Sequence, residues 1–85
     1  MANFYVSSGT SFSATINITY PSGSICTVTN YKKTWTAPNT TGSWTFKANE
    51  VGIYTIKAVN GNDSGTKEVK ITATDQTINI TVQYK

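Results

Sequence analysis

Apolar and polar residues alternate along most of this 85-residue chain. In the longest run, residues 12–20, the even positions are apolar or aromatic and the odd positions are Ser, Thr or Asn. Successive side chains of a strand point to opposite faces, so a period of two indicates a β-strand with one buried face. The turn sequence Pro21-Ser22-Gly23 then predicts the end of this strand.

The same pattern predicts six further strands. We expect them over residues 24–30, 34–37, 43–48 and 54–58, around Val69 and Ile71, and over residues 77–84. The apolar positions are mainly even-numbered, but Val69 and Ile71 are odd, so the loop at residues 60–65 must shift the phase. Short strands separated by turns roughly every 8–12 residues predict an all-β sandwich or small barrel. We assign the β-sandwich domain to residues 12–85, with residues 1–11 as an N-terminal segment or edge strand.

The composition supports strands and argues against several functions. The chain has sixteen Thr, eight Ile and six Val, with no Leu, Arg or His. β-Branched side chains favour a pleated sheet over a helix. The net charge is +3, all seven cations are Lys, and they form no cluster of the kind that binds nucleic acid. We expect no nucleic-acid partner, and no segment long and apolar enough to cross a membrane.

No set of residues suited to catalysis, cofactor binding or metal binding is found in the sequence. Without His, a Ser or Cys nucleophile lacks its usual general base, and the single Cys26 cannot build a zinc site. We expect Cys26 to be a small core residue. The loop at residues 60–65 has too few carboxylates for calcium and is predicted to be a hairpin turn. The chain is therefore predicted to be no enzyme and to need no cofactor.

The segment from Glu50 to Ile56 indicates a corner between two sheets. A Tyr near the start of a strand in immunoglobulin-type sandwiches donates its hydroxyl to an upstream backbone group. Tyr54 has the matching position after Gly52, and Ile56 stands where a disulfide-bonded domain would have Cys. We expect the Tyr54 ring to fill the core and its hydroxyl to bond to the chain before it.

Aromatic residues outside the buried phase are candidates for ligand contact. Trp44, Phe46 and Tyr54 follow the even-numbered pattern and are predicted to lie in the core. The phase of the short strand at residues 34–37 is not fixed by its neighbours. If it points outward, the possible ligand-contact residues form one aromatic and basic patch that could stack on a sugar or anchor a protein: Tyr31, Lys32, Lys33 and Trp35. The alternative is that Trp35 fills the core.

Two longer stretches carry a family resemblance. Residues 36–46 followed by 52–58 resemble the transthyretin-like (prealbumin-like) and PEGA-type domains of bacterial surface proteins. Residues 20–24, 42–44 and 82–84 are similar to small immunoglobulin-like domains in tail and other virion proteins of phages and prophages of Gram-positive bacteria. The resemblance implies a single seven-stranded immunoglobulin-like or transthyretin-like β-sandwich.

The resemblance also implies a function. It points to a non-enzymatic structural or binding module of a phage or prophage virion protein, which serves assembly or weak attachment to the host surface. Its partners would be other virion or surface proteins and cell-surface carbohydrate. The start of the chain has no signal-peptide pattern, which agrees with a virion protein made in the host cytoplasm. The alternative is a carbohydrate-binding or spacer domain of a secreted adhesin or glycan-degrading enzyme, located outside the cell or on its surface.

Overall fold

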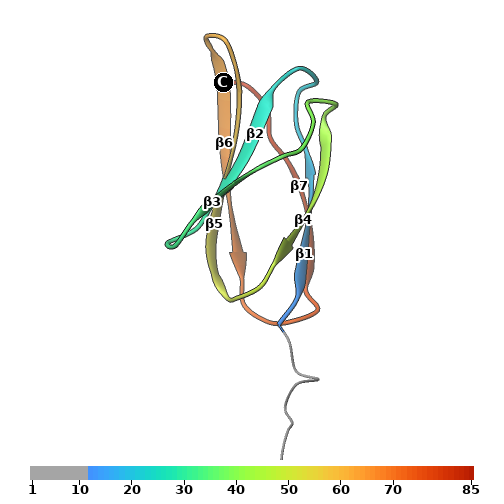
Figure 1. Cartoon of the computed structure of the whole chain (residues 1–85), viewed down its shortest axis with the longest axis vertical. Helices are drawn as coiled ribbons and strands as arrows, with labels where there is room; N and C mark the ends of the chain where they lie inside the picture. Colours follow the sequence, from blue (N-terminus) through green and yellow to red (C-terminus); the bar gives the residue numbers. More distant parts are fainter. Residues whose placement is uncertain (1–11) are drawn as a thin grey trace, which may run out of the picture.

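The computed structural model describes residues 12–85, which form seven strands and no helix (Figure 1). The all-β, seven-stranded sandwich predicted from the alternation is therefore confirmed. Residues 1–11, which we assigned to an N-terminal segment or edge strand, lie outside the described part. The strands are β1 (Ala14–Thr19), β2 (Ile25–Thr29), β3 (Thr34–Thr36), β4 (Ser43–Ala48), β5 (Gly52–Asn60), β6 (Asp63–Ile71) and β7 (Thr77–Thr81).

The strands form two sheets packed face to face (Figure 1). One sheet has three strands in the order β4-β1-β7, and the other has four in the order β3-β2-β5-β6. All pairs are antiparallel except β1 and β7, which run parallel although they are the first and last strands of the described chain. A parallel pair needs a long crossover connection, and here the intervening five strands provide it.

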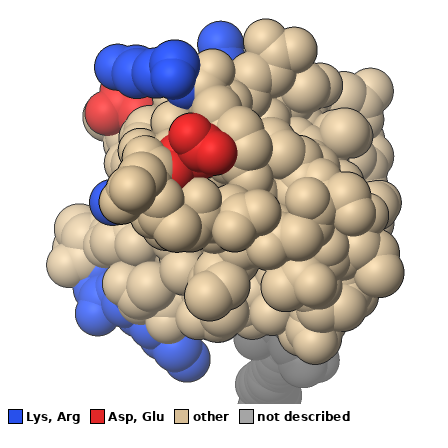
Figure 2. Space-filling view, turned by 90° about the horizontal axis from the view of Figure 1, so that it is seen from above, with Lys and Arg blue, Asp and Glu red and all other residues tan. Residues whose placement is uncertain are grey.

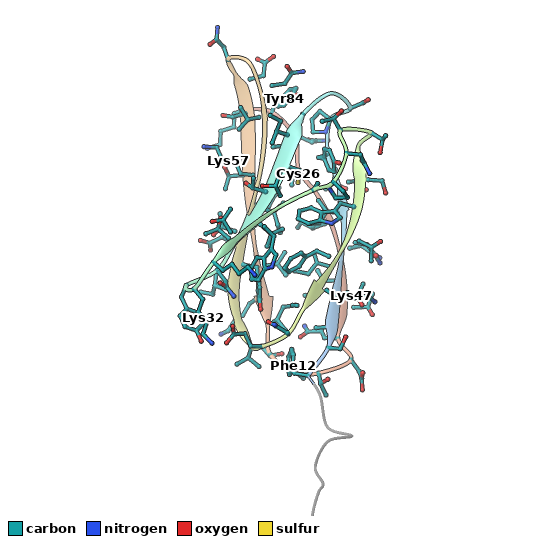
Figure 3. The ribbon with its side chains drawn as sticks, viewed as in Figure 1. Phe12, Cys26, Lys32, Lys47, Lys57 and Tyr84 are labelled. Carbon is teal, nitrogen blue, oxygen red and sulfur yellow. The ribbon has the colours of Figure 1, made fainter. Side chains whose placement is uncertain are left out.

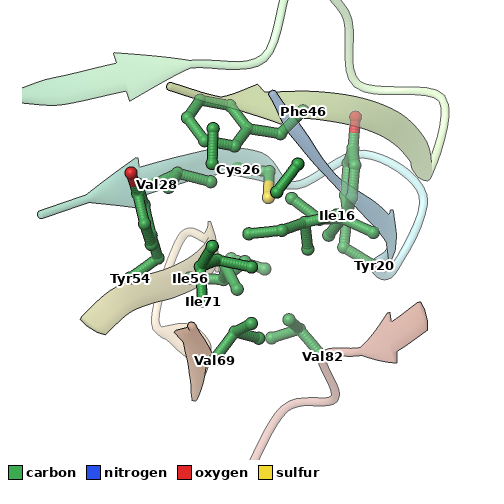
Figure 4. Close-up of a cluster of buried hydrophobic side chains, with 14 residues drawn as sticks. Ile16, Tyr20, Cys26, Val28, Phe46, Tyr54, Ile56, Val69, Ile71 and Val82 are labelled. Carbon is green, nitrogen blue, oxygen red and sulfur yellow. The ribbon is translucent and has the colours of Figure 1, made fainter. Parts of the chain in front are cut away.

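The core lies between the sheets and follows the even-numbered pattern (Figure 4). Cys26 is a fully buried core residue, as predicted, and its burial raises the thiol pKa to about 11, so the thiol is neutral at physiological pH. The buried hydrophobic residues are Ala14, Ile16, Ile18, Tyr20, Cys26, Val28, Phe46, Ala48, Tyr54, Ile56, Ala58, Val69, Ile71 and Val82.

A tight hairpin causes the predicted change of phase between β5 and β6. The expected loop at residues 60–65 is shorter than predicted, since β5 continues to Asn60 and β6 begins at Asp63. Gly61 in the two-residue turn has a φ of 61°, in the left-handed region that favours glycine. This turn pairs even with odd residues, for example Ala58 with Gly65. The start of β6 was not predicted because its inward register positions before Val69 are Asp63, Gly65 and Lys67, which leave no apolar signal.

The C-terminal residues connect the two sheets. The run predicted over residues 77–84 ends as a strand at Thr81, and the chain then crosses to β6, where the Lys85 N–H donates to the Ser64 carbonyl oxygen at 3.0 Å. The hydroxyls of Tyr84 and the buried Ser24 hydrogen-bond to each other. This crossing closes one end of the sandwich between β6 and β7.

Candidate binding site

The turn between β2 and β3 is shaped by one asparagine side chain. The Oδ1 atom of Asn30 accepts hydrogen bonds from the backbone N–H groups of Lys32 at 2.9 Å and Lys33 at 3.0 Å. Asn favours turns because its side chain can replace a backbone acceptor in this way. The bonds hold Tyr31 and Lys32 at the exposed tip of the hairpin, where Figure 3 shows Lys32 projecting from the sandwich. We call residues 30–35 the β2–β3 hairpin tip.

The corner between β4 and β5 lies next to this tip. The Tyr54 hydroxyl donates to the Glu50 carbonyl oxygen at 2.8 Å, and the Tyr54 ring is fully buried, which confirms the predicted tyrosine corner. The carboxylate of Glu50 accepts a 2.8 Å hydrogen bond from the Tyr31 hydroxyl and lies 3.3 Å from Lys32 Nζ. Glu50 thus connects the two elements: its carbonyl oxygen bonds to Tyr54 of the corner, and its carboxylate contacts Tyr31 and Lys32 of the tip.

These contacts shift the protonation of both charged partners. The hydrogen bond from Tyr31, with a smaller contribution from Lys32, lowers the pKa of the Glu50 carboxyl. Hydrogen bonds to Tyr31 and Glu50 raise the pKa of Lys32. The Asn30 amide also helps to lower the Glu50 pKa, although its buried Nδ2 group makes no hydrogen bond of normal geometry within residues 12–85. The tip therefore holds a compact ion pair at neutral pH.

Trp35 points toward the core rather than sharing a face with Tyr31. It lies opposite Val28 in the β2/β3 pair, and its half-buried ring packs edge-on against Phe46 with centroids 5.0 Å apart. Tyr31, in contrast, is 74% exposed. Trp35 therefore packs against the core, as in the alternative given above. Tyr31 and Trp35 do not form one continuous aromatic patch.

The two lysines of the tip each lie over an aromatic ring. Lys32 Nζ is 5.4 Å from the centroid of the Tyr31 ring, and Lys33 Nζ is 5.4 Å from that of Trp35. Both distances fall within the range of cation–π attraction. All four predicted contact residues therefore belong to one hairpin, with an exposed part at Tyr31 and a half-buried part at Trp35.

Glu50 and Asn30 belong to this arrangement but were not among the predicted contact residues. Asn30 precedes a tight polar turn, a position that favours Asn, so a local signal for it was present in the sequence. The Glu50 contacts join residues 18 or 19 positions apart and have no local signal.

The described residues offer no further chemical site. Residues 12–85 contain no detected pocket and no group of three or more Cys, Asp or Glu side chains able to hold a metal ion. No helix in that range is long and apolar enough to cross a membrane. No protein-family model and no curated protein sequence matches this chain.

Removing the corner hydroxyl should weaken the fold by a measurable amount. We expect Tyr54→Phe to lower the free energy of unfolding by about 0.5–1.5 kcal/mol, since the ring stays in place and one hydrogen bond to Glu50 is lost. Urea denaturation followed by Trp fluorescence measures this difference. Lys57→Gln, on an exposed side chain of the same strand, is the control. Unchanged stability in Tyr54→Phe would show that the corner bond contributes nothing.

The Glu50 carboxyl should titrate below the ordinary value of about 4.3. Because its pKa is lowered in the folded state, the contact stabilises the fold above that value, and this stability is lost as the pH falls through the lowered pKa. Carbon-13 NMR of the carboxyl group measures the midpoint. We expect Tyr31→Phe to move it upward, because the largest contribution is removed, and Lys57→Gln to leave it in place. A midpoint insensitive to Tyr31→Phe would contradict this explanation.

Proposed function

We propose that this chain is a non-enzymatic, transthyretin-like or immunoglobulin-like module of a phage or prophage virion protein, serving assembly or weak attachment to the host surface. The observation that carries the attachment role is the exposed β2–β3 hairpin tip, whose turn is held by hydrogen bonds to Asn30. The virion setting rests on the sequence resemblance. The alternative setting, in a secreted adhesin or glycan-degrading enzyme, uses the same surface.

The strand order supports a relationship to these sandwich families. In immunoglobulin domains strands B and E are neighbours in one sheet, and C, F and G in the other. The pair β1/β4 and the trio β2-β5-β6 fit these places, with the tyrosine corner at the start of β5. The place of strand A, however, is taken by the last strand, β7, running parallel to β1. At this edge of the three-stranded sheet the strand order therefore departs from that of an immunoglobulin domain.

The hairpin tip suits weak contact with a polymer that carries both sugar and negative charge. Tyr31 exposes most of its ring, and aromatic faces of this kind stack on sugars. Lys32 and Lys33 give the tip a positive charge that Glu50 only partly offsets. The turn bonds of Asn30 order the tip in advance, which lowers the entropy lost on binding. An open surface without a pocket is consistent with low affinity per site.

A binding titration with bacterial cell-wall polysaccharide tests the attachment role. We expect the full chain to bind it with a change in Trp fluorescence, because Trp35 is the last residue of the tip. Tyr31→Ala and Lys33→Ala should each weaken binding by about tenfold or more, and added salt should weaken it too. Lys57→Ala, which removes an exposed lysine on another part of the surface, is the matched control and should bind as well as the parent chain.

Two results would count against the attachment role. One is the absence of binding to native polysaccharide at millimolar sugar concentration. The other is binding that Lys57→Ala weakens as much as Lys33→Ala, which would indicate general charge attraction. Polysaccharide stripped of its negatively charged groups separates charge attraction from stacking on sugar. If the native polysaccharide binds and the stripped one does not, recognition is assigned to negative charge.

A further inference from the structure

Strands β1 and β7 contain the same five residues in the same order. Residues 15–19 and 77–81 both read Thr-Ile-Asn-Ile-Thr, and the parallel pairing places each residue beside its identical counterpart. On the outer face, Asn17 Nδ2 donates to Asn79 Oδ1 at 2.9 Å. On the inner face, Ile78 and Ile80 pack against the core. The structure therefore shows that this pentapeptide pairs well with an identical strand.

The other edge of β7 has unused backbone groups. Thr15 N donates to Gln76 O at 2.8 Å, and Val82 N donates to Thr19 O at 2.8 Å. Alternate residues of a parallel strand direct both backbone groups to the same neighbour, so the even residues of β7 face β1. Thr77, Asn79 and Thr81 consequently direct their N–H and C=O groups away from it. Within residues 12–85, β1 is the sheet neighbour of β7 and no strand lies on its other side.

The other three edge strands contain a lysine or directly follow one, whereas β7 does neither. Lys47 lies on β4, and Lys32 and Lys33 immediately precede β3. On β6, Lys67 is exposed although it pairs with the buried Ile56 and so occupies an inward register. Lysines at such positions oppose pairing with another chain. β7 has no charge, Pro or Gly. Figure 2, the view from above, shows its visible charges on the left, and Figure 3 places Lys47 of β4 on the side of the three-stranded sheet.

The pentapeptide reads the same in both directions. An antiparallel β7 from a second copy, related by a two-fold axis at Asn79, places Asn79 opposite Asn79 and Thr77 opposite Thr81. These odd residues carry the free backbone groups, so the facing residues can exchange both backbone hydrogen bonds. Ile78 meets Ile80 on the inner face. Each residue type therefore faces its own kind across the junction, as it does in the β1/β7 pair.

We propose that the free edge of β7 binds the β7 edge of a second copy of this chain, forming a two-fold symmetric dimer. The contact joins the two three-stranded sheets into one continuous sheet with an antiparallel pair of β7 strands at the junction. Such a self-complementary interface is the type that a two-fold axis requires. This proposal goes beyond the attachment role of the hairpin tip. It uses the opposite sheet and holds or fails independently of any polysaccharide ligand.

Sedimentation of the full chain over a range of concentrations tests this proposal. We expect a monomer–dimer equilibrium whose dissociation constant rises at least about tenfold in Asn79→Lys, because two like charges then face each other. Asn79→Pro should have a similar effect, since it removes an N–H from the free edge and leaves the backbone bonds to β1 in place. Both variants lose the side-chain bond from Asn17. Thr45→Lys adds the same charge on the outer face of β4 and should leave the dimer unchanged. Circular dichroism checks that each variant is folded.

Cross-linking then identifies what occupies the edge. Asn79→Cys should form a disulfide-linked dimer under mild oxidation and Thr45→Cys should not, while the buried Cys26 gives no background. A chain that stays monomeric at millimolar concentration overturns the proposal, as does a dimer that Asn79→Lys and Asn79→Pro leave intact. A double variant, Val6→Cys with Asn79→Cys, gives the third test. If it forms a cross-link and Asn79→Cys alone does not, the proposal is also overturned, because the N-terminal segment then occupies the edge.

Discussion

Gly65→Ala is expected to destabilise the domain by about 3 kcal/mol or more, a large share of the roughly 5–10 kcal/mol typical of a small domain. A Cβ atom at this position would lie 1.8 Å from the carbonyl oxygen of Gln83 and 2.6 Å from its carbon. Both are backbone atoms, so no side chain can rotate to make room. The C-terminal crossing must leave β6, and the Lys85–Ser64 hydrogen bond is lost with it.

Thermal and urea denaturation measure the effect of Gly65→Ala, and Gly61 offers the matched control. Nothing lies within 4 Å of a Cβ added at Gly61, whose φ of 61° is one that Asn tolerates. Gly61→Asn should therefore change stability by less than about 0.5 kcal/mol. Equal effects of Gly65→Ala and Gly61→Asn would mean that the close approach to Gln83 is relieved without penalty.

Phe46→Ala should lower the free energy of unfolding by about 3–5 kcal/mol, the range for removing a buried aromatic ring. Phe46 is 5% exposed and contacts three other aromatic rings, with centroid distances of 5.0 Å to Trp35, 5.4 Å to Trp44 and 5.8 Å to Tyr54. Its loss removes the central member of this group. Near-ultraviolet circular dichroism should lose intensity, because both Trp rings become less fixed.

Val51→Ala is the control for Phe46→Ala. Val51 is 53% exposed, so trimming it should change stability by less than about 0.5 kcal/mol. A Phe46→Ala chain with unchanged stability and an unchanged near-ultraviolet spectrum would show that the aromatic group does not support the fold. Retained stability with an altered spectrum would instead show that Trp35 and Trp44 repack around the space.

The alternation of apolar and polar residues was enough to predict most of the buried face. It works for β1 and β5 because each buries one side, so Ile16 and Ile56 stand out against polar neighbours. It fails where an inward position lacks an apolar side chain, as at Gly65. It is also ambiguous in β3, where three residues are too few to fix a period and the direction of Trp35 depends on how the preceding turn sets the register with Val28.

The candidate site could be predicted only in its local part. Tyr31 and its neighbouring lysines were identified because they adjoin a turn. Their connection to Glu50 depends on how two hairpins pack at one end of the sandwich, and alternation carries no information about that packing. The identical pentapeptides of β1 and β7 were visible in the sequence. A match of five residues does not indicate that the two strands pair, and antiparallel neighbours are the usual result of consecutive short strands.

The parallel pair of β1 and β7 also determines when this domain can finish folding. Asn17 and Asn79, which hydrogen-bond across the pair, are 62 residues apart. During synthesis β1 and β4 can meet early, but the three-stranded sheet stays incomplete until β7, residues 77–81, has left the ribosome. Contacts between residues so distant in sequence slow folding. We therefore expect a nascent chain that ends before residue 77 to leave one edge of β1 unpaired, open to another strand of the same sequence.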